Sequence, residues 1–69
     1  MTFGENLKRL RLTVNLTQEE VAIKLQISRQ SISKWEKDIA LPAIIYIIPL
    51  TKIYQCSIED IFLPIIDSL

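Results

Sequence analysis

The sequence predicts a single all-α domain of five short helices. Apolar residues recur at spacings of three and four along most of the chain, which is the period of an amphipathic helix. At three expected helix starts, Ser or Thr stands three residues before Glu or Asp, the pattern of a helix capping box. A chain of 69 residues has room for one small core, so residues 1–69 are expected to form one domain.

The first helix is expected to begin after Thr2, which forms a capping box with Glu5. Its apolar face has spacings of four, three and four residues and consists of Phe3, Leu7, Leu10 and Val14. Asn15 tolerates the left-handed backbone conformation, so the helix is expected to stop there.

A second and a third helix are expected to follow closely. Thr17 and Glu20 form the capping box of the second, which is only about two turns long. Ser28 is the expected N-cap of the third, which covers residues 29–37 and packs Trp35 into the core. The opposite side of this third helix carries rows of hydrogen-bond donors: Arg29, Gln30, Ser33, Lys34 and Lys37.

The fourth helix is the least regular element of the prediction. Pro42 suits its first turn, and its inner side is expected to be lined by Ile45, Leu50, Ile53 and Tyr54. Inside such a helix Pro49 would remove one backbone hydrogen bond, at a cost of about 3 kcal/mol. The prediction is therefore either a kink at Pro49 or a short turn at 43–47 followed by a helix that starts near Pro49.

The carboxyl-terminal end has more apolar residues than a small core can hold. Ser57 with Asp60 opens a short fifth helix, which Pro64 limits, and residues 64–69 are expected as a tail. The consecutive apolar residues from Ile44 to Ile48 cannot all point inward, and the tail adds Ile65, Ile66 and Leu69. These residues are expected to form a contact with another chain.

Charge is unevenly distributed between the two halves of the chain. Eight basic and eight acidic side chains give a formal net charge of zero. Residues 1–37 nevertheless hold seven basic and four acidic side chains, a net charge of +3, and residues 38–69 hold one and four, a net charge of −3. A polyanionic partner is therefore expected to contact the first half.

The residue inventory excludes most chemistry. With no His, a single Cys and no Gly-rich phosphate loop, the chain lacks the ligands of a metal or nucleotide site and the bases of the common nucleophiles. We therefore expect no enzymatic activity, no cofactor and no metal. The longest apolar run, residues 39–50, contains Pro42 and Pro49 and is too short to cross a membrane, and no signal peptide opens the chain. The expected location is the cytoplasm, at the nucleoid.

The segment LTQEEVAIKLQISRQSISKWEKDIALP closely resembles the helix-turn-helix family of phage repressors and Cro proteins, also called the XRE family. The resemblance covers about residues 4–63. Ala22 matches the small residue required where the two helices cross, and SRQSISKWE is a common sequence of the helix that enters DNA. The resemblance implies a lambda-repressor-like fold with the helix-turn-helix proper at about 18–37, and a transcriptional regulator that binds an operator in double-stranded DNA.

The family's functional positions map onto the third helix and its surroundings. The implied base-reading residues are Arg29, Gln30, Ser33 and Lys34, since Arg suits guanine and Gln suits adenine. The alternative is a solvated polar face with a phosphate contact. The implied phosphate-binding residues are Gln18, Ser28 and Lys37. Arg11 and Glu36 match an ion pair that joins the first helix to the end of the third, and independent surface charges are the alternative.

The sequence departs from the family pattern at one position and in one tripeptide. Gln26 stands where the family usually has Gly, at a turn position that favours positive φ, so we expect a penalty of about 1 kcal/mol. Asp38, Ile39 and Ala40 replace a frequent Asn-Gly-Lys, which adds a carboxylate and removes a phosphate contact from this loop. Neither departure alters the donor rows of the third helix.

The predicted function is that of a transcriptional regulator, of the repressor type found in this family, that binds its operator as a homodimer. The dimer is expected to form through Ile65, Ile66 and Leu69, with residues 44–48 as a further contributor. Two alternatives remain. The chain is either an antitoxin-like subunit whose apolar half binds a partner protein, with autoregulatory DNA binding, or a DNA-binding module of a longer regulator.

Overall fold

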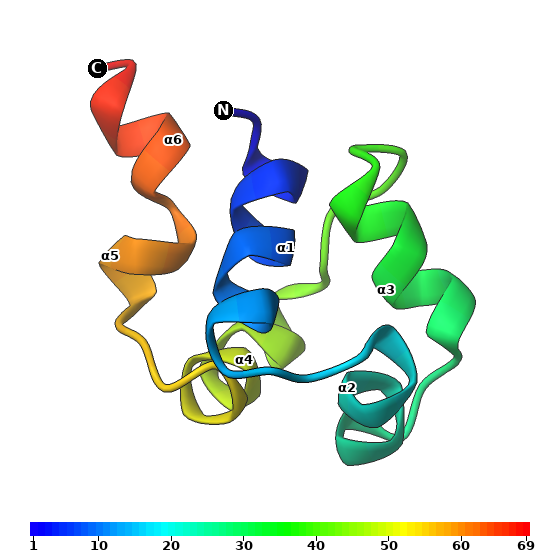
Figure 1. Cartoon of the computed structure of the whole chain (residues 1–69). Helices are drawn as coiled ribbons and strands as arrows, with labels where there is room; N and C mark the ends of the chain where they lie inside the picture. Colours follow the sequence, from blue (N-terminus) through cyan, green and yellow to red (C-terminus); the bar gives the residue numbers. More distant parts are fainter.

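Six α-helices and one 3₁₀ turn make up the structure, a computed structural model that describes residues 1–69 (Figure 1). They are α1 (Phe3–Thr13), α2 (Gln18–Leu25), α3 (Arg29–Glu36), η1 (Ile44–Tyr46), α4 (Ile47–Ile53), α5 (Ile58–Ile61) and α6 (Leu63–Asp67). The predicted all-α class is confirmed. The helix count is higher than expected because the carboxyl-terminal tail is itself helical.

All three predicted capping boxes are present. Thr2 Oγ1 accepts from the Glu5 amide at 3.1 Å, and Glu5 Oε1 accepts from the Thr2 amide at 2.8 Å. Thr17 and Glu20 open α2 in the same way, and Ser57 and Asp60 open α5. Ser28 caps α3 by accepting from the amide of Ser31 at 3.3 Å. The side chains at these helix starts thus satisfy backbone donors that the helices leave unpaired.

Four residues with positive φ stand at or just after the ends of helices, and none of them is glycine. They are Asn15, Gln26, Asp38 and Gln55, with φ between 54° and 60°. The positive φ expected at Gln26 is therefore confirmed. Side chains with a Cβ are strained in this conformation, by about 1 to 2 kcal/mol for most residue types.

The single glycine, Gly4, has no positive φ and is required instead for close packing between two helices. Gly4 lies in the first turn of α1, where a Cβ would stand 2.5 Å from the Trp35 carbonyl oxygen and 2.6 Å from that of Glu36. Real side chains do not tolerate such distances to backbone atoms. Gly4 therefore allows α1 to rest directly on the backbone at the end of α3.

The core lies between α1, α2 and α3 on one side and α4 and α5 on the other. Its nine buried members are Leu7, Leu10, Val21, Ala22, Ile32, Trp35, Leu50, Tyr54 and Ile61. The Trp35 ring packs against Tyr46 with centroids 5.6 Å apart. The predicted core position of Trp35 is confirmed, and the donor side of α3 is left facing outward.

Of the two alternatives for the fourth helix, the structure shows a short turn followed by a helix and no kink at Pro49. A 3₁₀ turn at Ile44–Tyr46 precedes α4, whose first turn contains Pro49. A proline there removes no helical hydrogen bond, because the first amides of a helix have no partner in it. Pro42 was expected in the helix but lies in the loop before it. Ile45 was expected inside but is 71% exposed, because the turn shifts the helical phase and brings Ile47 inward instead.

The carboxyl-terminal helices pack on α1. Buried Asn6 donates through Nδ2 to the carbonyl oxygens of Asp60 at 2.7 Å and Ile61 at 3.0 Å, which end α5. Pro64 falls in the first turn of α6, where it is tolerated, so the chain continues as a helix past it. Figure 1 shows α6 beside α1 and both chain ends on the same side of the molecule. No helix is long enough to cross a membrane.

Candidate nucleic-acid interface

The outward side of α3 carries the predicted donors. Arg29, Gln30 and Lys34 are exposed and Ser33 is half-buried, while Ile32 and Trp35 on the opposite side are buried. Lys37 is exposed at the end of the helix and Ser28 is exposed at its start. One helix thus offers a row of donors with candidate phosphate contacts at both ends.

A buried ion pair ties α3 to α1. Arg11 Nε lies 2.7 Å from Glu36 Oε2, and Arg11 Nη2 lies 3.0 Å from Glu36 Oε1, a two-pronged contact. A third nitrogen, Nη1, donates to the carbonyl oxygen of Leu16 at 2.8 Å. The hydrogen bond to Glu36 raises the pKa of the Arg11 guanidinium, against the opposing effect of burial. The pair fixes the last turn of α3 relative to α1.

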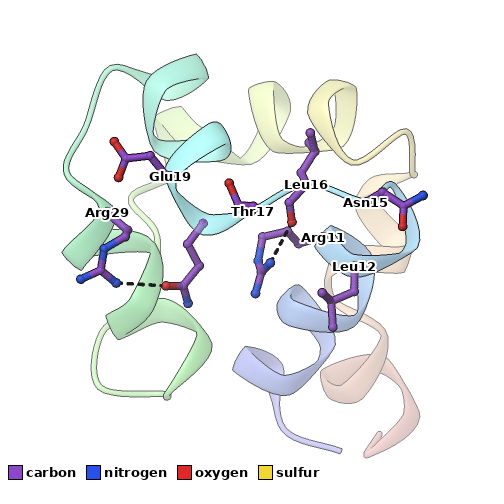
Figure 2. Close-up of a pocket in the computed structure, with 8 residues that line it drawn as sticks. Arg11, Leu12, Asn15, Leu16, Thr17, Glu19 and Arg29 are labelled. Atoms are coloured by element: carbon purple, nitrogen blue, oxygen red, sulfur yellow. Dashed lines mark hydrogen bonds between the residues drawn. The ribbon is translucent and has the colours of Figure 1, made fainter.

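Gln18 connects this ion pair to Arg29 on the outward side of α3. Its Nε2 donates to Glu36 Oε1 at 3.0 Å, and its Oε1 accepts from Arg29 Nη1 at 3.2 Å. Figure 2 shows the Arg29 guanidinium reaching its hydrogen-bond partner across the gap between α3 and α2. Gln18, an implied phosphate contact, therefore lies where it also restrains Arg29. The side chains form a continuous chain of contacts from Arg11 through Glu36 and Gln18 to Arg29.

An open depression of about 530 Å³ lies beside these groups (Figure 2). Its walls come from the end of α1, the loop to α2 and the start of α2, with Arg29 on the far side. Its lining has two guanidinium groups, Arg11 and Arg29, and one carboxylate, Glu19. The start of α2 adds backbone amides that are free to bind an anion. Arg11 is already paired with Glu36, so Arg29 is the guanidinium of this depression that no ion pair neutralises.

Sequence reasoning missed one polar residue at the end of α3. Asp38 was interpreted as an added carboxylate in a DNA-facing loop. In the structure its Oδ1 accepts from the Gly4 amide at 2.8 Å and its Oδ2 accepts from Thr2 Oγ1 at 2.6 Å. Both partners are more than thirty residues away in sequence, so no local pattern could have found them.

Most of the surplus apolar residues of the second half are exposed. Ile44 is 84% exposed and Leu69 is 99% exposed, and Ile45, Ile48, Ile65 and Ile66 are exposed as well. An apolar groove of about 200 Å³ is lined by Ile44 and Ile65 together with Phe3, Leu41, Pro42, Ile47 and Phe62. The two segments expected to meet another chain therefore border the same groove, although Ile47 itself is buried.

Residues 7–61 match the helix-turn-helix family over most of the chain. The chain belongs to the Cro/XRE-type helix-turn-helix family. It is 38% identical over 61 residues to the HTH-type transcriptional activator BcrR of Enterococcus faecalis, covering 88% of this chain and 30% of BcrR. It is 35% identical over 57 residues to the HTH-type transcriptional regulator DicA of Escherichia coli, covering 83% of this chain and 42% of DicA.

A third helix-turn-helix relative has a comparable size. The chain is 42% identical over 57 residues to the uncharacterized HTH-type transcriptional regulator MJ0272 of Methanocaldococcus jannaschii, covering 83% of this chain and 86% of that protein. The chain thus spans less than half of BcrR and DicA and most of MJ0272. The family and the names of these relatives support DNA-binding transcription regulation.

Proposed function

We propose that this helix-turn-helix protein regulates transcription by binding an operator sequence as a homodimer, with α3 in the major groove. The observation that carries the proposal is the donor row on α3: Arg29, Gln30, Ser33 and Lys34 project from a helix whose other side is fixed in the core. Base edges are read by such donors at the start of a helix that enters the groove. Membership in a family of regulators also supports the expectation that the chain is not an enzyme.

Phosphate contacts are assigned to the groups that flank this row. Gln18 and Ser28 lie at the starts of α2 and α3, where free amides favour anions, and Lys37 lies at the end of α3. The hydrogen bond between Gln18 and Arg29 supports a joint role, since a phosphate bound beside Gln18 would find Arg29 already restrained.

Binding-site selection from random DNA, followed by affinity measurements on the selected site, tests the reading role. Replacing Arg29 or Gln30 by Ala is expected to cost about 1 to 3 kcal/mol on that site and to relax preference at one base pair. Lys52→Ala is the matched control for Arg29→Ala, because it removes one positive charge from an exposed residue of α4. Wild-type discrimination by the Arg29/Gln30 double variant at matched salt would exclude α3 as the reader.

Salt dependence tests the phosphate contacts. Each phosphate neutralised by the positively charged half is expected to add about −0.9 to the slope of log affinity against log salt concentration. Lys37→Ala is expected to reduce this slope by about 1 and to weaken all DNA sequences alike. An affinity that does not change with salt would argue against phosphate-mediated docking.

The homodimer is assigned to the apolar groove and the exposed residues beside it. Ile65 and Ile66 are 47% and 43% exposed on α6, and Ile65 lines the groove together with Ile44. Burial of this surface between two copies would remove it from water, and a twofold dimer would place two α3 helices about 34 Å apart, one helical turn of DNA. Sedimentation equilibrium is expected to show a dimer that Ile65→Asp/Ile66→Asp dissociates, and a dimer indifferent to that change would exclude α6 from the interface.

The same apolar surface favours one second candidate, an antitoxin-like subunit that binds a partner protein with its second half. A monomeric chain that co-purifies at fixed stoichiometry with the product of a neighbouring gene would select this alternative. Ile65→Asp/Ile66→Asp would then abolish the association with that protein instead of self-association.

A further inference from the structure

We propose that Asp38 is a positioning residue for DNA reading: its carboxylate fastens the end of α3 to the start of α1 and so sets the angle at which α3 meets DNA. The inference rests on the proposed function of α3. It assigns a role to a side chain that is neither a base-reading nor a phosphate-binding candidate, and whose charge alone would oppose DNA binding.

Both carboxylate oxygens of Asp38 are used on the first turn of α1. Oδ1 accepts from the Gly4 amide at 2.8 Å and Oδ2 accepts from the Thr2 hydroxyl at 2.6 Å. The Thr2 hydroxyl in turn accepts from the Glu5 amide, so one hydroxyl both caps α1 and holds Asp38. A carboxylate is well suited to this place, because the start of a helix carries a partial positive charge.

The backbone at this point leaves little freedom. Asp38 has a φ of 60°, which turns the chain sharply at the end of α3. Beside it, Gly4 lies so close to the carbonyl groups of Trp35 and Glu36 that no side chain fits between them. The two helices are therefore joined where they touch, by two hydrogen bonds to one carboxylate.

The contact between Asp38 and α1 lies at the carboxyl-terminal end of α3, whereas Arg29 lies at the amino-terminal end. Loss of this contact would therefore displace Arg29 by tilting α3. Eight residues of helix span about 12 Å, and a rotation of about 10° at the fastened end would move Arg29 by about 2 Å. A binding site tolerates displacements of about 0.5 Å before its contacts weaken. Since α2 and α3 pack on each other and Gln18 holds Arg29, both helices would turn together relative to α1, about the Arg11–Glu36 ion pair that still joins α3 to α1.

A positioning role and a purely electrostatic role of Asp38 predict opposite changes in affinity for the preferred site when the carboxylate is removed. If Asp38 acted only as a negative charge, its removal would strengthen binding to every DNA sequence, because phosphate would be repelled less. If Asp38 positions α3, its removal weakens binding to the preferred site and leaves binding to random DNA unchanged or slightly stronger. The ratio of the two affinities separates the two roles.

The test uses the full chain with two substitutions. Asp38→Gly removes the carboxylate and accommodates the positive φ, so the loop keeps its backbone conformation. Asp38→Asn keeps one acceptor and also tolerates positive φ. Glu59→Gln is the matched control, because it removes a negative charge from an exposed residue of α5. Circular dichroism verifies that each variant is folded at the temperature of the measurement.

Affinities for the selected site and for random DNA of equal length are measured by fluorescence anisotropy at one salt concentration. Asp38→Gly is expected to lower their ratio about tenfold, Asp38→Asn by less, and Glu59→Gln not at all. Hydrogen exchange of the Gly4 amide, measured without DNA, is expected to accelerate in Asp38→Gly while the amide of Leu10 stays protected.

The outcomes are distinguishable. A wild-type protein that binds all DNA equally would contradict the proposed function, while the Gly4 amide would still report on the contact with Asp38. A wild-type protein that discriminates, together with an Asp38→Gly variant that keeps the same ratio, would overturn the positioning role. Affinities that rise in parallel for both DNA molecules would also overturn it, in favour of charge alone.

Discussion

The two halves of this protein hold their helices in different ways. In α1 to α3, polar side chains reach from one helix to another: Arg11 to Glu36, Gln18 to Arg29 and Asp38 to Gly4. In the second half, the side-chain hydrogen bonds of the hydroxyl groups are local, as in Ser57 with Asp60, and large apolar side chains stay exposed. Directional bonds fix orientation, whereas apolar area is non-directional and favours association. The first half is therefore suited to reading and the second to binding another chain.

The largest expected effect comes from breaking the buried ion pair of the first half. Arg11→Met leaves the Glu36 carboxylate buried without its partner, which is expected to cost about 3 to 5 kcal/mol of unfolding free energy. Adding Glu36→Leu to the same chain should cost less than the sum of the two single changes. Urea unfolding measures both, with Lys8→Met on the exposed side of α1 as the control. A loss below about 1 kcal/mol for Arg11→Met would contradict the buried geometry.

The next effect tests the backbone contact between α1 and α3. Gly4→Ala adds a Cβ within 3 Å of three backbone atoms that have no side-chain flexibility. Overpacking of this kind costs about 1 to 3 kcal/mol or more, against a gain of about 1 kcal/mol from the better helix propensity of Ala. We expect a net loss of about 2 kcal/mol in thermal or urea unfolding. A stabilised variant would mean that the two helices separate easily at this point.

A gain in stability, smaller than the losses above, is expected from one substitution in each half of the chain. Gln26→Gly and Gln55→Gly each relieve a positive φ, which should offset the extra freedom of the unfolded chain and raise stability by about 0.5 to 1 kcal/mol. Lys8→Gly, at a helical position of α1, is the control and should cost about 1 kcal/mol. Equal gains in stability at Gln26 and Gln55 would show that helix ends are strained to the same extent in both halves. The difference between the halves would then lie in their exposed side chains.

The smallest effect is the pH dependence of the helix caps. Backbone hydrogen bonds at Thr17 and Ser57 lower the pKa of Glu20 and of Asp60 below the ordinary values of 4.5 and 3.8. Since the folded pKa is the lower one, the contribution of each cap is complete above these ordinary values and is lost as pH falls through the folded pKa. Glu20→Gln and Asp60→Asn should each flatten the acid limb of a stability profile. An unchanged acid limb would assign the acid sensitivity to other carboxylates.

Local sequence signals were enough to predict how α1, α2 and α3 begin and end and where α5 begins. A capping box needs residues only three positions apart, and Asn15 or Gln26 adopts its positive φ within one turn of the helix it ends. The face of α3 also followed from its own periodicity. These features depend on the chain close to each residue, which is why the sequence alone was sufficient for them.

The features that were predicted wrongly or missed depend on distant or cooperative contacts. Ile45 was placed inside because a regular helix from Pro42 would put it there, but the 3₁₀ turn before α4 changes the phase. The hydrogen bonds of Asn6 and Asp38 join residues more than thirty positions apart. Such partners are chosen by the tertiary packing, so no local pattern indicates them.

The position of the chain ends has a practical consequence. Both ends lie on the same side of the molecule, and the start of α1 contacts the end of α3 (Figure 1). Arg29 stands at the other end of α3, about 12 Å away along an eight-residue helix. A tag, a fluorophore or a second domain fused at the amino terminus would therefore leave the molecule away from Arg29 at the start of α3, but close to Lys34 and Lys37 at its end. Immobilisation through that end for DNA-capture experiments therefore needs a linker long enough to keep Lys34 and Lys37 accessible to DNA.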